Sequence, residues 1–399
     1  MNISIFSDNF YPEISGVSDS ITSLARELSA RGHNVRFYVP AYSRKDYKKG
    51  GVTAENPPLG PCVEFRRLFS VPYPTPTGQG RAIIPTGLRS ISLRDFRPDI
   101  IHTQLFFGAG IEALIASRIL KKPLVGTNHT ALKEFLKYSP VRAAWAENLA
   151  LRYVNWYYGQ CEAVTAPSRS VIEEMEFFGF KKEARIISNP IDTKLFAPSA
   201  NKNIPRKKFG FPEYTVIHAG RLGEERKIDV IIRALALAKK KIPSLALAIA
   251  GRGADEGRLR NLAASLGIRN AVRFLGFLNH KTLAEAYNAS SVFAITSTAD
   301  TQSMVMMQAM ACGIPVVGVK ARGIPEYIHP QNGYLIEPDN PSALAEKIIF
   351  LFKNPAKRKD LGRGARAFAE KFSAASIAEE WEMLYKKVIE QYAKKHRKA

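Results

Sequence analysis

Two polar side chains eight positions apart, Asp300 and Gln308, are the first candidates for chemistry in this sequence. Asp300 lies in the polar loop 296–301, which follows the apolar run VFAI, and Gln308 lies about two helical turns further on. Between them Ser303 can cap a helix, and Gly313 can end it in a left-handed conformation. The run VVGV that follows predicts a buried parallel strand. In this layout the helix N-terminus lies at the carboxyl edge of a doubly wound sheet, where phosphates and sugar hydroxyls bind.

The stretch 295–319 resembles the E-x7-E signature of the retaining glycosyltransferases of family 4, followed by that family's Gly-x-Pro-Val-Val run. The family has two Rossmann-like α/β domains that face each other across a cleft, the GT-B arrangement, and the resemblance implies this fold here. In the family the first carboxylate contacts the donor sugar and the second hydrogen-bonds the ribose of the nucleotide. Here Asp300 is one methylene shorter than glutamate, and Gln308 keeps an acceptor oxygen without the charge.

The start of this helix is also implied in the donor site. Ser303 stands where the family usually has a glycine. The residues that the resemblance assigns to the donor around the helix start are Thr301, Gln302, Ser303 and Met304.

The run G-R-L-G-E-E-R-K-I-D at 220–229 is similar to the family's G-R-L-x-x-E-K-x-x-D, in which an arginine and a lysine neutralise the donor diphosphate. Arg221 matches the arginine, Arg226 takes the place of the lysine, and Lys227 stands beside it. Two such cations suit a diphosphate leaving group, because negative charge develops on it as the glycosidic bond breaks. We therefore expect no metal ion and no cofactor besides the donor substrate. Alternatively, these are ordinary surface charges.

Several further positions are assigned to the donor by the resemblance. Gly16 stands at a loop-helix junction after the first strand, and the matching loop of the family approaches the donor diphosphate. Gly220 begins the cationic run, and Gly251 lies in a turn between a strand and a helix, a pattern that is weak by itself. The family holds the nucleotide base in the loop after the strand that corresponds to AVRFLG, so Phe277 and Leu278 are candidates for base contact.

Two histidines, His102 and His129, stand at the carboxyl ends of predicted strands. A histidine at such an edge is more often a hydrogen-bonded structural residue than a catalytic one. The phrase TNHT, however, resembles a YHT-like motif of the lipid-modifying members of family 4, whose histidine lies by the hydroxymethyl group of the donor sugar. We therefore expect His129 in the catalytic site and a structural role for His102.

Length and composition indicate a globular chain with two domains. The sequence has 399 residues, of which 46% are hydrophobic and 24% charged. No apolar run is long enough to span a bilayer, and the start MNISIFSDNF resembles a first strand without a secretory leader. Three widely spaced cysteines argue against a disulfide scaffold and against a Cys-based zinc site. A cytoplasmic location is expected.

The formal net charge of +22 suggests an anionic partner. A membrane surface, a nucleotide phosphate and a nucleic acid are all compatible with this charge, as is a solvated basic surface without a partner. Nucleic-acid binding is disfavoured, because the sequence has no helix-turn-helix, RNA-recognition or zinc pattern.

The run SNPID resembles the family's N-P-x-D junction between the two domains. We expect an acceptor-binding domain over residues 1–190, a nucleotide-sugar-binding domain over 191–372, and a final segment over 373–399. The final segment contains an amphipathic helix, about Ala374 to Lys394, with Trp381, Leu384 and Val388 on one stripe. In the family such a helix crosses back to the first domain, and here it should end in a frayed basic tail.

The predicted reaction is retaining transfer of a hexose from a UDP-linked donor to a membrane lipid. Phrases between Pro72 and Pro85, together with PDIIH and TNHT, look most like the diacylglycerol and phosphoinositide glycosyltransferases of the family. Aromatic and basic residues interleave over 132–158, which suits peripheral docking on the cytoplasmic face of an anionic membrane, above all through LKEFLKY. A packed helix is the alternative. Rival functions are transfer to a soluble acceptor, a GT-B epimerase, and a binding protein that has lost catalysis.

Overall fold

The computed structural model describes residues 1–13, 15–49, 56–73, 80–87, 89–130 and 144–397. The chain divides into two compact units. The N-terminal unit contains Met1–Pro190 together with Ala374–Ala399, and the C-terminal unit contains Ile191–Ser373. In the described part of the chain, no helix is both long enough and apolar enough to cross a membrane.

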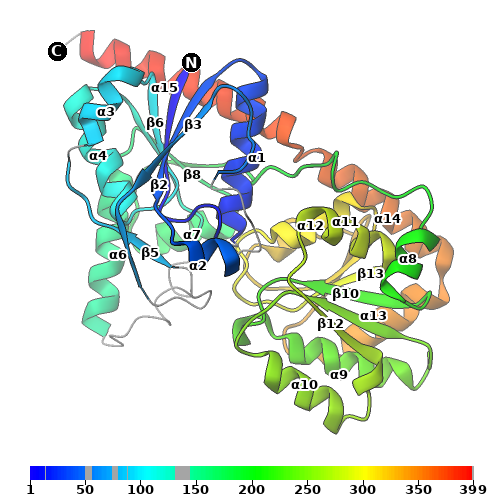
Figure 1. Ribbon diagram of the computed structural model, residues 1–399. Helices are drawn as coiled ribbons and strands as arrows, with labels where there is room; N and C mark the ends of the chain where they lie inside the picture. Colours follow the sequence, from blue (N-terminus) through cyan, green and yellow to red (C-terminus); the bar gives the residue numbers. More distant parts are fainter. Residues whose placement is uncertain (14, 50–55, 74–79, 88, 131–143, 398–399) are drawn as a thin grey trace. The chain divides into compact units, whose positions relative to one another are not determined.

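Seven parallel strands form the sheet of the N-terminal unit, in the order β3-β2-β1-β6-β7-β8-β9. The order reverses between β1 and β6, so the carboxyl ends of these neighbours flank the switch point of the sheet (Figure 1). The strands are β1 (Asn2–Phe6), β2 (Asn34–Pro40), β3 (Val63–Leu68), β6 (Ile100–Thr103), β7 (Leu124–Thr127), β8 (Ala163–Ala166) and β9 (Ala184–Ile186). A separate antiparallel ribbon consists of β4 (Ser70–Pro72) and β5 (Arg81–Ile83).

The helices of the N-terminal unit include the last helix of the chain. They are α1 (Gly16–Ala30), α2 (Arg44–Lys49), α3 (Arg89–Phe96), α4 (Gly108–Leu120), α6 (Ala144–Gly159), α7 (Arg169–Phe177) and α15 (Ala374–Arg397). The predicted stripe of α15 is confirmed, because Trp381, Leu384 and Val388 are all buried. The expectation of a frayed tail is wrong for Lys394 to Arg397, which are helical. Cations at a helix C-terminus interact favourably with its dipole, which explains this extension.

Six parallel strands form the sheet of the C-terminal unit, in the order β12-β11-β10-β13-β14-β15. Counted along this unit, the order is 3-2-1-4-5-6, which is that of dinucleotide-binding folds. The strands are β10 (Thr215–Ala219), β11 (Ala246–Ala250), β12 (Val272–Gly276), β13 (Val292–Ile295), β14 (Val316–Val319) and β15 (Gly333–Ile336). The helices are α8 (Asn203–Phe209), α9 (Ile228–Lys239), α10 (Glu256–Ser265), α11 (His280–Ala289), α12 (Met304–Ala311), α13 (Pro341–Lys353) and α14 (Pro355–Glu370), with short 3-10 turns η1 (Glu224–Arg226), η2 (Arg269–Ala271) and η3 (Ile324–Glu326).

Burial on both faces explains why the central strands are continuous apolar runs. Helices cover both sides of the C-terminal sheet, with α9 and α10 on one side and α11 and α12 on the other (Figure 1). Every residue of β10, β11, β13 and β14 is buried. Because such sheets leave their strand ends as the accessible edge, the loops after these strands are the places where ligands can bind.

The aromatic helix of the N-terminal unit differs from the sequence expectation. Its described part, α6, begins at Ala144, and the preceding stretch 131–143, which contains LKEFLKY, lies outside the described residues. We expected close packing on nearly all sides as the alternative to membrane contact, but Trp145, Leu149 and Trp156 are exposed. Among the described residues, one face of α6 therefore exposes large apolar side chains, while Val154 and Tyr157 on the other face are buried.

Candidate functional site

The two loops that carry the predicted catalytic residues of the C-terminal unit meet at the switch point of its sheet. β10 and β13 are adjacent parallel strands, and the strand order reverses between them. The loop after β10 carries Arg221 and Arg226, and the loop after β13 carries Asp300. Ligands of doubly wound sheets bind at this position. The structure therefore brings the residues predicted for the diphosphate and for the donor sugar together.

Arg226 and Asp300 form an ion pair that joins these loops. Nη1 of Arg226 donates to Oδ2 of Asp300 over 2.5 Å and lies 3.4 Å from Oγ of Ser297. Oγ1 of Thr296 donates to the carbonyl oxygens of Arg226 and Lys227, which fixes the backbone on the arginine side. Burial acts to raise the pKa of Asp300, but the Arg226 guanidinium outweighs burial and holds this pKa below its ordinary value. Asp300 is therefore anionic at neutral pH.

A carboxylate that the sequence reasoning missed, Glu225, lies between the two arginines. Its Oε1 accepts from Nη2 of Arg221 over 2.6 Å and lies 3.6 Å from Nε of Arg226. Lys227, the neighbouring cation, has a left-handed backbone, and its Nζ lies 3.3 Å from Oδ1 of Asp339. The motif E-E-R contains the signal for Glu225, since a carboxylate four residues after Arg221 can pair with it.

Glycines allow the loops after neighbouring strands to stack backbone against backbone. The N–H of Gly220 donates to Ala250, and the N–H of Gly251 donates to Gly276. Gly220 and Gly251 have φ of 140° and 138°, and a Cβ on Gly251 would lie 1.8 Å from the carbonyl oxygen of Gly220. No other residue type fits at Gly251. Both predicted glycines thus keep the carboxyl edge of the sheet free of side chains.

The helix after Asp300 begins and ends as the sequence predicts. Oγ of Ser303 accepts from the N–H of Met306, which makes Ser303 the N-cap of α12. Gly313 follows the helix with a φ of 72°. The other residues predicted around the helix start are half-buried or buried: Thr301, Gln302 and Met304.

Gln308 lies on α12 with only 4% of its surface exposed, and its Oε1 has no hydrogen-bond partner among the residues that the structure describes. A buried polar group without a partner costs about 1–3 kcal/mol. An acceptor oxygen held in this state is suited to a hydroxyl donor from a ligand. This is the chemistry predicted for the ribose.

The base-binding candidates and one further histidine complete the C-terminal site. Phe277 and Leu278 follow β12 and are half-buried. His218, which the sequence reasoning did not single out, lies on β10 and is buried. Its Nδ1 donates to the carbonyl of Ala294 over 3.0 Å, and burial lowers the pKa of His218 to about 4. The imidazole is therefore neutral, and its buried Nε2 has no hydrogen-bond partner.

The two remaining predicted residues, His129 and Gly16, lie in the N-terminal unit. His129 follows β7, and its Nε2 donates to Oε1 of Gln104 over 2.7 Å. Burial lowers the pKa of His129 to about 4, so the ring is neutral at pH 7. Gly16 is the first residue of α1, directly after the N-cap Ser15, whose Oγ accepts from the N–H of Ser18 over 3.1 Å.

His102 has the structural role that we expected. It is completely buried, with Nδ1 and Nε2 each 2.7 Å from a hydroxyl, Tyr385 on one side and Thr127 on the other. Burial lowers the pKa of His102 to about 3. The contact with Tyr385 fastens α15 to the N-terminal sheet.

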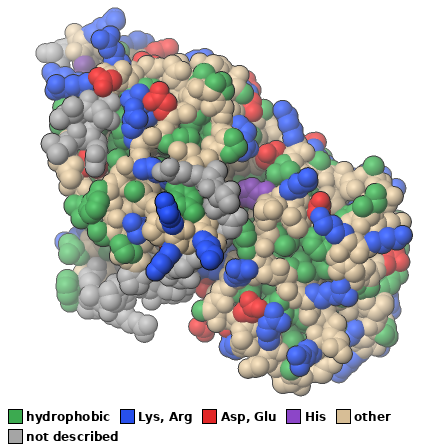
Figure 2. All heavy atoms as spheres, viewed as in Figure 1, with side chains coloured by type: hydrophobic (Ala, Val, Ile, Leu, Met, Phe, Trp, Pro, Cys, Tyr) green, Lys and Arg blue, Asp and Glu red, His purple; other side chains and the backbone are tan. Residues whose placement is uncertain are grey.

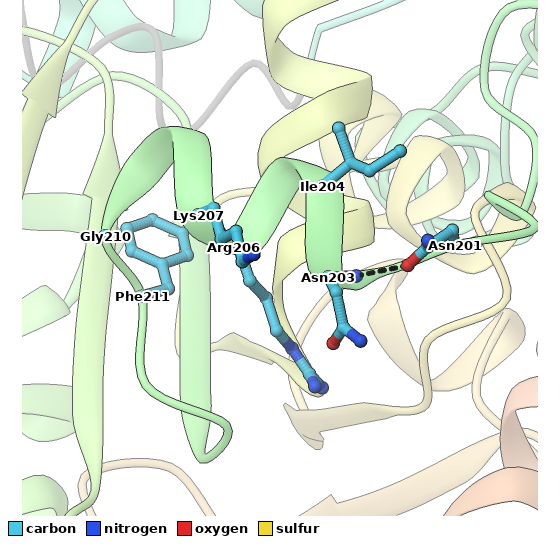
Figure 3. Close-up of a pocket in the computed structure, with 7 residues that line it drawn as sticks. All are labelled: Asn201, Asn203, Ile204, Arg206, Lys207, Gly210 and Phe211. Carbon is cyan, nitrogen blue, oxygen red and sulfur yellow. Dashed lines mark hydrogen bonds between the residues drawn. The ribbon is translucent and has the colours of Figure 1, made fainter.

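An open surface hollow beside α8 lies apart from these residues (Figure 3). The N–H of Asn203 donates to Oδ1 of Asn201 at its rim over 3.0 Å. The hollow is lined by Asn201, Asn203, Ile204, Arg206, Lys207, Gly210 and Phe211, none of which the sequence assigns to chemistry.

Two doubly wound α/β units, one with cationic and acidic loops converging at its switch point, are typical of proteins that bind a phosphorylated ligand. Residues 14–195 match the family model described as Glycosyltransferase Family 4, and residues 201–368 match the model described as Glycosyl transferases group 1. The chain therefore belongs to the family 4 glycosyltransferases and is an enzyme of that class.

Curated relatives include enzymes that modify lipids and others that do not carry a lipid in their name. An alpha-monoglucosyldiacylglycerol synthase of Streptococcus pneumoniae is 27% identical over 79% of this chain and 70% of its own length. The alpha-monoglucosyldiacylglycerol synthase of Acholeplasma laidlawii is 24% identical over 99% of both chains. A GDP-mannose-dependent alpha-mannosyltransferase of Mycobacterium tuberculosis is 28% identical over 85% of this chain and 84% of its own.

A solved structure confirms the fold. The crystal structure of Anabaena HepE in complex with UDP matches 97% of this chain and 100% of its own with a TM-score of 0.75 and 21% identity. The predicted architecture of two Rossmann-like domains is therefore correct.

Proposed function

We propose that this enzyme moves a hexose, with retention of configuration, from a UDP-sugar to the free hydroxyl of a membrane lipid such as diacylglycerol. The observation that carries the donor half is the site at the switch point of the C-terminal sheet, where the Arg226–Asp300 pair lies in the loops and Gln308 keeps a buried unpartnered oxygen. The acceptor half is supported by two relatives that are named as diacylglycerol glucosyl transfer enzymes.

In the proposed reaction, the bond between C1 of the sugar and the diphosphate oxygen breaks while the acceptor hydroxyl attacks C1 on the same face. The hydroxyl proton passes to the leaving phosphate. Arg221 and Arg226 stabilise the charge that develops on the diphosphate, which is the role of preorganised cations in such transfers. Asp300 contacts the donor sugar, and His129 lies by its hydroxymethyl group, as the family resemblance implies. The proposal requires no metal ion.

The departures from the family pattern at Asp300 and Gln308 are compatible with this role. Asp300 remains anionic, because Arg226 holds its pKa low. Gln308 is uncharged, but its Oε1 can accept a hydrogen bond from a ribose hydroxyl. The alternative of a binding protein without catalysis predicts that nucleotide binds but is not released from a sugar donor.

Membrane docking is proposed for the exposed face of α6. Trp145, Leu149, Arg152 and Trp156 recur at helical spacing along this face, and Trp145 and Trp156 are 69% and 48% exposed. Aromatic side chains beside a cation suit the interface of a bilayer. Figure 2 shows hydrophobic side chains at the edge of the N-terminal unit and Lys and Arg side chains spread over both units. The net charge of +22 favours an anionic surface.

The donor half is tested by calorimetric titration of UDP, GDP and ADP into wild type, Gln308→Ala and a control, Gln331→Ala, whose side chain lies on the exposed surface of the C-terminal unit. UDP should bind most tightly, and Gln308→Ala should weaken it about 10-fold, the effect of one lost hydrogen bond. Tighter binding of GDP would replace UDP by GDP in the proposal, a choice that the named mannosyltransferase relative makes reasonable. Equal affinities for wild type and Gln308→Ala would remove Gln308 from the site.

A further inference from the structure

A buried carboxylate outside the predicted set, Asp8, lies at the switch point of the N-terminal sheet. It follows β1 by two residues, and the first turn of α4, which follows β6, approaches it. Its Oδ1 accepts from the N–H of Ala109 over 2.8 Å, and the first helical residues of α4 are otherwise without a side-chain cap. One oxygen of Asp8 therefore serves a structural purpose, as the cap of a thirteen-residue helix.

To the residues that the structure describes, the second oxygen of Asp8 makes no direct hydrogen bond, although, against the larger effect of burial, the N–H groups of Phe107 and Gly110 also lower the pKa of the carboxyl. Asp8 is only 5% exposed, and among the described residues its Oδ2 has no hydrogen-bond partner. An unpaired buried carboxylate oxygen is costly, and at the switch point of a sheet a hydroxyl of a ligand can satisfy it.

Three of the hydroxyl groups near Asp8 cannot supply that donor, because each donates to a backbone carbonyl. Tyr153, Tyr157 and Tyr158 lie close enough for the charge of Asp8 to raise their pKa values, after the larger effect of burial. Their hydroxyls donate to the carbonyls of Phe106, Gly110 and Thr127 over 2.6, 2.8 and 3.0 Å, respectively. A tyrosine has only one proton to donate, so none remains for Oδ2.

The surroundings of Asp8 also specify the charge of a ligand. Glu13, on the same loop, is buried as well, and Tyr42 donates to its Oε2 over 3.2 Å. Burial raises the pKa of Tyr73 most, and the charges of Glu13 and Asp8 raise it further. Both carboxyl groups therefore lie near the Tyr73 hydroxyl. In a chain of net charge +22, two buried carboxyl groups share this loop, and the Arg67 guanidinium donates to the carbonyl of Tyr11 in the same loop. Directly beside Asp8 and Glu13 the two carboxyl groups favour a hydroxyl donor over a phosphate.

We propose that Oδ2 of Asp8 accepts a hydrogen bond from the nucleophilic hydroxyl of an uncharged alcohol acceptor and so positions it for transfer. This inference rests on the proposed glycosyl transfer and narrows its acceptor to the diacylglycerol type, against lipids with a phosphate beside the reacting hydroxyl. Asp8 takes no proton in the reaction, because the hydroxyl proton passes to the leaving diphosphate.

The test compares Asp8→Asn with Glu112→Gln in the full chain. Asparagine keeps an oxygen to cap α4 but replaces the free oxygen by an amide that cannot accept. Glu112 is the matched control, because it is a buried carboxylate on α4 whose Oε1 accepts from the N–H groups of Thr86 and Gly87. In the described part of the chain, its Oε2 also lacks a partner. UDP affinity, melting temperature and transfer from UDP-glucose to diacylglycerol in neutral vesicles are measured for each variant.

Asp8→Asn should lower kcat/KM for diacylglycerol about 10- to 100-fold, the range for a lost hydrogen bond to a charged group, with UDP affinity unchanged and the melting temperature no lower. Glu112→Gln should leave unchanged the ratio of kcat/KM for diacylglycerol to the affinity for UDP. Equal acceptor efficiency in wild type and Asp8→Asn would overturn the inference, as would an equal fall in both variants.

A pH profile separates positioning from a structural role. Burial raises the pKa of Asp8 to about 7, against the lowering effect of the N–H groups at the start of α4. The ionised carboxylate is the better acceptor, so wild-type kcat/KM for the lipid should rise between about pH 6 and about pH 8 and be flat for Asp8→Asn. The same rise in the variant would refute the assignment.

The choice of acceptor distinguishes this inference from the proposed function. Transfer to phosphatidylinositol in preference to diacylglycerol would overturn the uncharged acceptor while leaving a lipid glycosyltransferase. Transfer to a soluble alcohol alone would overturn the lipid acceptor. A selective loss of that transfer in Asp8→Asn would then still support hydroxyl binding by Asp8.

Discussion

Replacing Asp300 by asparagine removes a charge but keeps a side chain of nearly the same shape between the two loops of the donor site. A hydrogen bond to a charged group contributes about 1.5–3 kcal/mol and a neutral one about 0.5–1.5 kcal/mol, so Asp300→Asn should cost about 1–2 kcal/mol. The Asp300 and Arg226 side chains are both largely buried, which leaves little screening by solvent. For a domain of this size the loss corresponds to about 2–8 °C in melting temperature.

The pH dependence of this loss has a defined sign. The pKa of Asp300 in the folded protein lies below its ordinary value of 3.8. A carboxylate of this kind contributes stability that is present above the ordinary value and is lost as pH falls through the lowered one. The difference in melting temperature between wild type and Asp300→Asn should therefore be constant near neutral pH and shrink below about pH 4.

The assay is thermal unfolding of both proteins across this pH range, with Asp339→Asn as control. Asp339 pairs with Lys227 over 3.3 Å, but its side chain is 60% exposed. An exposed pair contributes less than about 1 kcal/mol, and the left-handed backbone of Asp339 tolerates asparagine. Equal shifts for the two variants, or a difference for Asp300→Asn that persists unchanged at low pH, would refute the reasoning.

Three further predictions concern other parts of the chain. Tyr385→Phe removes the hydroxyl that contacts Nδ1 of His102 in the N-terminal core and should cost about 1–3 kcal/mol in chemical unfolding; an unchanged midpoint would contradict this. Gly251→Ala should abolish UDP binding in calorimetry, because the new Cβ would collide with the backbone of Gly220 and the φ of Gly251 is left-handed. Retained affinity for UDP would show that the loops can move apart. Trp145→Ala should weaken binding to anionic vesicles in a flotation assay about 10-fold. Phe177→Ala on α7 removes a side chain that is similarly exposed and should not weaken this binding. Equal losses in the two variants would point to nonspecific adsorption.

Much of the C-terminal site was predictable, because the alternation of buried strands and helices fixes which loops share the carboxyl edge of the sheet. Asp300, Arg221 and Arg226 each follow a strand, and caps at Ser303 and Gly313 define α12 from local sequence alone. The pairing of Arg226 with Asp300 was not predictable, since side-chain partners depend on distances between loops. Glu225, by contrast, stands four residues after Arg221 in the same loop, so its pairing with Arg221 was predictable from local sequence.

In the N-terminal unit, local sequence patterns did not predict the surroundings of Asp8 or the exposure of α6. The isolation of Oδ2 in Asp8 depends on three tyrosines of α6 that donate elsewhere, and no spacing around Asp8 in the sequence indicates this. Likewise, the apolar composition of α6 did not show that one face is exposed, because periodicity gives the faces of a helix but not what covers them.

The measurement that tests the central claim most directly is nucleotide release from UDP-, GDP- and ADP-sugars, with and without vesicles that contain diacylglycerol. We predict release from a UDP-sugar that rises only when the lipid is present. Release that lipid does not change would contradict the lipid acceptor, and tight nucleotide binding without release from any donor would contradict transfer itself.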